Sequence, residues 1–116
     1  MATKIIRSFT FAISGVKEAF TREPNLRIHA ALAAVALILA TLLSFSVYEW
    51  ALLIFTIFFV FILEFVNSAL EAVVDLVSPE LREEARVAKD ISAACVLLAA
   101  VMALGVGAVL FLPKIL

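Results

Sequence analysis

The sequence has few of the residues that build disulfide-linked, loop-rich or nucleic-acid-binding proteins. Its 116 residues include one cysteine, and only 16% of them carry a charge, with a net charge of −1. A single cysteine, Cys95, excludes an internal disulfide and a metal site made of several thiolates. The near-neutral charge predicts no nucleic-acid partner. The three glycines, Gly15, Gly105 and Gly107, lack the spacing of a phosphate-binding loop, which excludes P-loop and protein-kinase architectures.

What the chain does have is long apolar stretches. Hydrophobic residues make up 66% of the sequence, and the mean hydropathy is +1.19. Values this high are typical of membrane proteins rather than of soluble domains of this size. Three stretches, at about 28–45, 50–77 and 91–112, are long enough to cross roughly 30 Å of hydrocarbon. We therefore expect an all-α integral membrane protein that forms a single domain over residues 1–116, embedded in a lipid bilayer.

The positive charges predict how these spans are oriented. Eight of the nine basic residues fall on one side: Lys4, Arg7, Lys17, Arg22 and Arg27 before the first span, and Arg82, Arg86 and Lys89 between the second and third. Loops rich in lysine and arginine stay in the cytoplasm. We therefore expect a cytoplasmic N-terminus, a cytoplasmic loop around Pro79 and an external C-terminus.

Two shorter helices are also expected beside the spans. Between about 4 and 22, apolar side chains recur at steps of three or four, which predicts an amphipathic helix on the membrane surface. The pair Glu23-Pro24 should end it, because the residue before a proline avoids the helical region, and Pro24 can then open the first span. Similarly, Ser78 is predicted to cap a short helix that begins at Pro79.

A stripe of polar residues stands out in the second span. The stripe begins at Glu64, and its other members, Asn67, Glu71 and Asp75, follow Glu64 by 3, 7 and 11 residues. On a 3.6-residue helix they lie within about 80° of one another, along about 16 Å. A carboxylate in or near hydrocarbon costs several kcal/mol, so such groups face protein or a water-filled cavity. Acids with an amide suit a hard cation such as Mg²⁺. The stripe is therefore a candidate functional site.

The expected membrane depths of these residues suit phosphoryl transfer from ATP. Glu23, Glu71, Lys89 and Asp90 should lie near one cytoplasmic plane, with Glu64 roughly 10 Å deeper than Glu71. Phosphoryl transfer needs Mg²⁺ held by carboxylates, a cation on the phosphate and a base for the attacking hydroxyl. Glu23 and Glu71 could hold the metal, and Lys89 could neutralise phosphate. The deeper Glu64 could accept a proton from a hydroxyl that arrives through the bilayer.

These residues resemble a known family. The stretch EFVNSALEAVVD from Glu64 to Asp75, with Ala88-Lys89-Asp90 downstream, is similar to the prokaryotic diacylglycerol kinase family. This family comprises small trimeric lipid kinases of the bacterial cell membrane and includes the undecaprenol kinases. The resemblance covers nearly the whole chain and implies a homotrimer that uses ATP and Mg²⁺. It implies that Glu64 is the catalytic base, that Glu71 and Glu23 are ligands of the Mg²⁺ on ATP, and that Asn67 and Asp75 support the site.

The resemblance also implies a set of nucleotide contacts. Lys89 and Asp90 are expected to contact ATP. The family usually has an arginine near the start of the surface helix, where this sequence has Lys4 or Arg7, and either could meet phosphate. The loop from Glu80 to Arg82 corresponds to the family's nucleotide-side loop without matching its residues.

The lipid that is phosphorylated is predicted from a shorter segment. The segment from Glu23 to His29, EPNLRIH, together with Ser8-Phe9-x-x-Ala12, resembles the undecaprenol kinase branch. We therefore expect undecaprenol as the acceptor, with diacylglycerol as the alternative. His29 itself is expected to be an interfacial helix residue rather than a ligand. A non-enzymatic pore, transporter or holin-like protein could also line acids along a bundle, but it would not need the Lys89-Asp90 pair.

Overall fold

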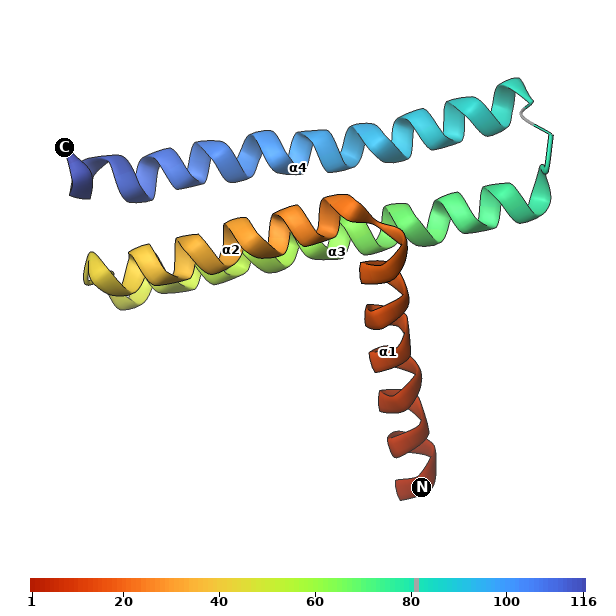
Figure 1. Ribbon diagram of the computed structural model, residues 1–116, viewed down its shortest axis with the longest axis horizontal. Helices are drawn as coiled ribbons and strands as arrows, with labels where there is room; N and C mark the ends of the chain where they lie inside the picture. Colours follow the sequence, from red (N-terminus) through yellow and green to blue (C-terminus); the bar gives the residue numbers. More distant parts are fainter. Residues whose placement is uncertain (81) are drawn as a thin grey trace.

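The computed structural model describes residues 1–80 and 82–116, which form four α-helices and no β-strand. The helices are α1 (Ala2–Arg22), α2 (Pro24–Leu42), α3 (Val47–Val77) and α4 (Glu83–Ile115). Helix α3 packs against α4 along most of its length and against α2 on another side, while α1 leaves the bundle sideways (Figure 1). The expected architecture of an N-terminal helix followed by three apolar helices is confirmed.

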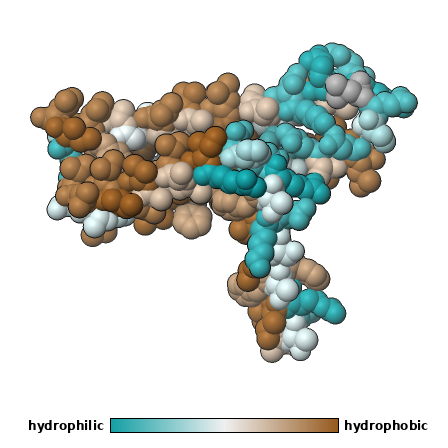
Figure 2. Space-filling view, viewed as in Figure 1, coloured by the Kyte–Doolittle hydropathy of each residue, from teal (hydrophilic) through white to brown (hydrophobic). Residues whose placement is uncertain are grey.

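Helices α2, α3 and α4 are each long and apolar enough to cross a membrane. They begin three to eight residues before the predicted starts at 28, 50 and 91. At 31 residues, α3 is about 46 Å long, so it exceeds roughly 30 Å of hydrocarbon. Apolar side chains cover the bundle toward the α2–α3 turn, whereas hydrophilic ones gather at the end near the α3–α4 loop (Figure 2). One end of α3 therefore extends into a polar layer.

The bend between α1 and α2 is fixed by backbone and side-chain hydrogen bonds. Glu23 has an extended conformation (φ −111°, ψ 102°), and Pro24 follows it as the first residue of α2, as predicted. The Arg27 guanidinium reaches back from α2 and donates from Nε to the carbonyl of Phe20 at 3.1 Å, and from Nη2 to the carbonyl of Thr21 at 3.3 Å. These bonds satisfy carbonyls at the end of α1 that have no helical partner. The bend is thus a defined corner that holds Glu23 beside α2.

The corner end of α1 is also anchored on α3. The ring of Phe20 lies 6.2 Å from that of Phe61 and 6.3 Å from that of Phe65, measured between centroids. Rings at these separations attract one another and exclude water from the corner. Farther along α1, the apolar side chains point outward, as expected of a helix that lies on a membrane surface.

The prediction of a short helix that begins at Pro79 is wrong. Ser78 ends α3, and its hydroxyl donates to the carbonyl of Glu80 within a turn instead of capping a new helix. Helix α4 begins only at Glu83, with Arg82 at its N-cap. An acid in the first turn of a helix is stabilised by the helix dipole, which favours a start at Glu83. From Glu83 onward, the segment that was assigned to a separate helix is therefore the first part of α4.

An aromatic and ionic cluster closes the opposite end of the bundle. Ser46 and Glu49 form a capping box at the start of α3, with the Ser46 N–H donating to Glu49 Oε1 at 2.9 Å. The same carboxylate lies 3.2 Å from Lys114 Nζ of α4. The ammonium also sits over the ring of Phe45, at 5.5 Å, and that ring is 5.0 Å from the ring of Phe111. This cluster joins the last turn of α4 to the α2–α3 turn.

We expect Lys114→Met to lower the thermal unfolding midpoint of the detergent-solubilised protein by a few degrees, because it removes both the ion pair and the cation–π contact. Thermal scans followed by circular dichroism would measure the midpoint. Lys17→Met is a matched control, since Lys17 makes no ion pair in the described part of the chain. Equal midpoints for the two variants would contradict a stabilising role for the cluster.

Candidate functional site

The polar stripe lies on the face of α3 that the sequence predicted to be functional, and its exposure changes along the helix. The side chain of Glu64 is 2% exposed, and Asn67 is 8% exposed. Glu71 is half-buried, and Asp75 is exposed near the end of α3. The stripe thus runs from the dry interior of the bundle to its polar end.

The buried end of the stripe contacts α2. Oε1 of Glu64 lies 3.2 Å from Nε2 of His29. The approach lacks hydrogen-bond geometry, so Oε1 accepts no hydrogen bond within the part of the chain that the structure describes. A buried polar atom without a partner is uncommon, and such atoms are found at catalytic sites. His29 was expected to be an ordinary interfacial residue, and the structure instead brings it to the most buried acid in the molecule.

Asn67 connects the stripe to α4. Its Oδ1 accepts a hydrogen bond from the Ser92 hydroxyl at 2.6 Å, and its Nδ2 donates to Oε1 of Glu71 at 3.3 Å. Because the two ends of the amide have different partners, these bonds fix its orientation. Ser92 is itself buried and was not singled out from the sequence, where it is one small residue among several. The chain Ser92–Asn67–Glu71 therefore holds the Glu71 carboxylate in place.

The wet end of the stripe is occupied by ion pairs. Nζ of Lys89 pairs with Asp75, which joins α4 to α3. Asp90 faces another way and accepts a hydrogen bond from Arg86 at 2.7 Å, and Arg86 also pairs with Glu83. Arg86 and Asp90 thus pair on a solvent-exposed face of α4. A phosphate that reached Lys89 would compete with Asp75 for the ammonium group.

The two predicted metal ligands lie on different elements. Glu23 is at the α1–α2 corner, and Glu71 is on α3. Among the described residues, no cluster of three or more histidine, cysteine or acidic side chains could hold a metal ion. Mg²⁺ in phosphoryl-transfer sites is held by one or two carboxylates, with phosphate and water completing the shell. A pair of oxygen donors is therefore compatible with Mg²⁺ that arrives on ATP.

The remaining predicted nucleotide contacts are not gathered at the stripe. Lys4 and Arg7 lie in the first two turns of α1, and the N-terminal end of that helix points away from the bundle (Figure 1). Glu80 lies in the turn after α3, and Arg82 is the N-cap of α4. A single chain thus brings together Glu64, Asn67, Glu71, Asp75 and Lys89, and leaves Lys4 and Arg7 at a distance.

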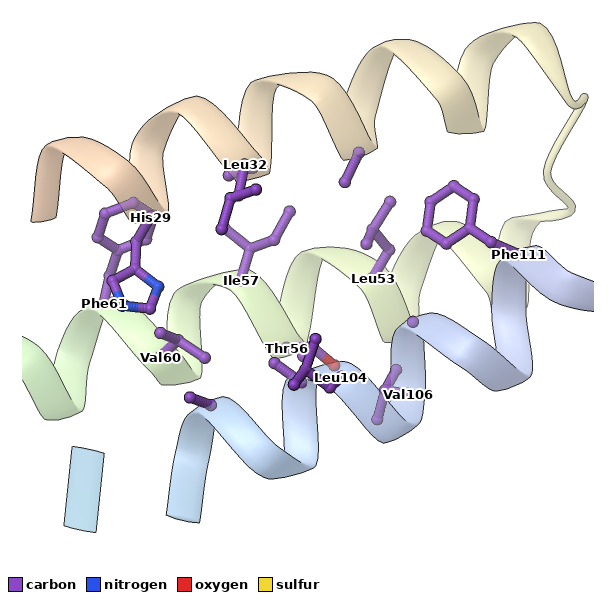
Figure 3. Close-up of a pocket in the computed structure, with 15 residues that line it drawn as sticks. His29, Leu32, Leu53, Thr56, Ile57, Val60, Phe61, Leu104, Val106 and Phe111 are labelled. Atoms are coloured by element: carbon purple, nitrogen blue, oxygen red, sulfur yellow. The ribbon is translucent and has the colours of Figure 1, made fainter. Parts of the chain in front are cut away.

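A groove of about 400 Å³ opens between α2, α3 and α4. Its walls are almost entirely apolar, and Figure 3 shows His29 and Phe61 at one end and Phe111 at the other. The other polar side chain on the wall is Thr56, whose hydroxyl donates to the carbonyl of Leu52 at 2.8 Å. The groove is suited to a hydrocarbon chain, and one end of it reaches the residue beside Glu64.

Comparison with known proteins connects this arrangement to an activity. Residues 10–111 match the family model described as prokaryotic diacylglycerol kinase. A diacylglycerol kinase from Synechocystis is 42% identical over 117 residues, which is 100% of this chain and 67% of that protein. An undecaprenol kinase from Bacillus subtilis is 36% identical over 112 residues, which is 97% of this chain and 91% of that protein. A diacylglycerol kinase from Escherichia coli is 34% identical over 101 residues, 87% of this chain and 83% of its own length.

These relatives are all named as kinases of lipid alcohols, which favours an enzyme over the pore, transporter or holin-like alternatives. The family predicted from the segment between Glu64 and Asp90 is the family whose model spans most of the chain. With its three apolar helices and the acidic stripe on α3, the chain belongs to the prokaryotic diacylglycerol kinase family and is a membrane lipid kinase.

Proposed function

We propose that this lipid kinase transfers the γ-phosphoryl group of ATP to the primary hydroxyl of undecaprenol, giving undecaprenyl phosphate and ADP. A bond forms between the lipid oxygen and the γ-phosphorus, and the bond from that phosphorus to the β–γ bridging oxygen breaks. The hydroxyl proton passes to the site and ends on Glu64. The observation that carries the proposal is the buried Glu64 oxygen, which accepts no hydrogen bond among the described residues and lies beside His29 at one end of an apolar groove.

The gradient of exposure along the stripe separates the two substrates. Glu71, Asp75 and Lys89 belong to the polar end, where a nucleotide can approach from water. Lys89 can neutralise phosphate once Asp75 is displaced. The Coulomb attraction on its ammonium group grows with the charge of the anion, and the phosphates of ATP carry more charge than one carboxylate. Glu23 and Glu71 would hold the Mg²⁺ of ATP, which neutralises charge on the phosphates. Asn67 keeps the Glu71 carboxylate oriented toward that position.

The assignment of the acceptor lipid rests on the groove and on one relative. The groove has room for only part of a polyprenyl chain, so the rest of the tail would leave through the lateral opening into the bilayer. Some of the matching relatives are named diacylglycerol kinase, and the one from Bacillus subtilis is named undecaprenol kinase. The match to the undecaprenol kinase extends over nearly the full length of both proteins. Together with the segment EPNLRIH at the corner, this favours undecaprenol over diacylglycerol.

The orientation and assembly belong to the same proposal. Eight of the nine basic residues lie before the first apolar helix segment or between the second and third, which favours a cytoplasmic site in the bacterial cell membrane, with a cytoplasmic N-terminus and an external C-terminus. Most large apolar side chains of the bundle point outward, where lipid or another copy of the chain can cover them. We propose a homotrimer, in which Lys4 or Arg7 of one copy could reach the nucleotide of another.

We expect Glu64→Gln to retain ATP binding and to lower turnover by at least ~100-fold, since general-base catalysis contributes about 10²–10⁴-fold. Phosphorylation of undecaprenol in mixed micelles with labelled ATP measures turnover. Glu18→Gln changes an exposed acid on α1 and is the matched control. Near-normal turnover in Glu64→Gln would contradict the role of this carboxylate.

Removal of the Glu71 carboxylate tests the proposed metal ligand. We expect Glu71→Ala to raise the Mg²⁺ concentration needed for half-maximal activity and to weaken ATP binding at the same time, because the Mg²⁺ bridges nucleotide and protein. A Mg²⁺ titration and a nucleotide-binding assay measure the two effects. If the metal requirement of Glu71→Ala equals that of Glu18→Ala, Glu71 does not hold the metal.

Competition between lipids tests the acceptor. Hydrophobic tail contacts discriminate weakly, by about 1–3 kcal/mol for a methylene-scale difference, so selectivity should come from the headgroup end near His29. We expect undecaprenol to be phosphorylated with a higher kcat/KM than dioleoylglycerol, with shorter prenols still used. The ratio of the two products in mixed micelles gives this preference directly. A clear preference for dioleoylglycerol would overturn the assignment of the lipid and leave the kinase mechanism intact.

A further inference from the structure

The groove and the buried acid meet at one side chain. His29 lines the groove, whereas Glu64 does not. Thr56 also lines it, but its hydroxyl proton is already donated to a backbone carbonyl. A hydroxyl that is delivered along the groove therefore meets the imidazole of His29, which Figure 3 shows at one end of the groove, before it can meet the carboxylate of Glu64.

The position of the imidazole is that of a bridge. His29 is 23% exposed and Glu64 is 2% exposed, so the ring stands between the accessible groove and the enclosed acid. The 3.2 Å from Nε2 to Oε1 is within hydrogen-bonding reach after a small rotation of either side chain. Oε1 has no competing donor among the described residues. A neutral imidazole carries a proton on one ring nitrogen and a lone pair on the other, so it can accept one proton while donating another.

We propose that His29 is a catalytic residue that relays the proton of the lipid hydroxyl to Glu64, an inference that rests on the function proposed above. In the tautomer with hydrogen on Nε2, Nδ1 accepts the hydroxyl proton as the lipid oxygen bonds to the γ-phosphorus of ATP. The Nε2 proton moves to Oε1 of Glu64 in the same step. The imidazole ends neutral in its other tautomer, the carboxyl group is protonated, and ADP leaves with the electron pair of the broken bond.

The relay accounts for two observations that remain unexplained if Glu64 removes the proton from the lipid hydroxyl directly. It gives the unpartnered oxygen of Glu64 a donor at the moment of reaction. It also explains how the carboxylate can act while it lies off the wall of the groove that delivers the substrate. General acid–base groups in free enzymes often have long or poorly aligned hydrogen bonds that tighten in the reacting complex, as the geometry here requires.

Two substitutions of His29 separate a relay from a purely positioning role. In His29→Gln, the side-chain amide keeps a donor for Glu64 but cannot accept and release a proton. We expect this variant to lose at least ~100-fold in turnover with the KM for ATP unchanged. His29→Ala should lose as much, and imidazole added to the micelles should restore part of its turnover in proportion to concentration. Thr41→Val is the control, because Thr41 is an exposed residue of α2 outside the groove.

Two outcomes would overturn the relay. Turnover of His29→Gln within a few-fold of the unsubstituted protein would mean that His29 only orients Glu64. Loss of turnover in both variants without any rescue of His29→Ala by imidazole, measured where ATP binding is intact, would mean that no proton passes through this position. Both results leave lipid phosphorylation by the unsubstituted protein standing, whereas failure of that protein to phosphorylate any lipid alcohol would refute the proposed function itself.

Discussion

The burial of one carboxylate is the constraint on which the rest of the site depends. An ionised acid in an apolar bundle is costly unless other groups interact with it, and Glu64 is enclosed by helices that are otherwise almost entirely hydrophobic. Its polar neighbour on α2 is His29, and among the described residues one of its oxygens accepts no hydrogen bond. An enclosed carboxylate with an oxygen open to a new hydrogen bond suits a base that acts on a hydroxyl arriving from the bilayer.

The rest of the architecture places that acid between the apolar groove and the polar end of the bundle. Asn67 and Ser92 join α3 to α4 one turn beyond Glu64, and Asp75 and Lys89 join the same helices two turns farther on. Toward the other end of the bundle, the helices separate enough to leave an apolar groove. Under the proposed function, the polar end with its ion pair and the apolar groove would give the nucleotide and the lipid separate approaches to one carboxylate.

Much of this could be predicted from the sequence, because helical periodicity and hydrophobic length are local properties. The phasing of the stripe from Glu64 to Asp75 follows from 3.6 residues per turn, and the corner follows from Glu23-Pro24. The partners of the stripe could not be predicted, because Ser92 and His29 approach α3 only after the helices pack. The turn after α3 was mispredicted for a related reason: the Ser78 hydroxyl can cap a helix or bond within a turn, and local sequence does not choose between them.

The separation of the apolar groove from the polar end also bears on why a kinase of this kind would phosphorylate a lipid rather than water. ATP hydrolysis requires a water molecule activated at the γ-phosphate, and general bases that are open to solvent supply one readily. Here the candidate base is the most enclosed acid of the stripe, and the groove beside it has walls that bind water poorly. On its polar side Glu64 is followed by Asn67, which is buried and whose amide is already hydrogen-bonded to Glu71 and Ser92. A long-chain alcohol, in contrast, brings its hydroxyl through the groove with its own hydrocarbon, so preference for the lipid follows from access rather than from recognition of the headgroup alone.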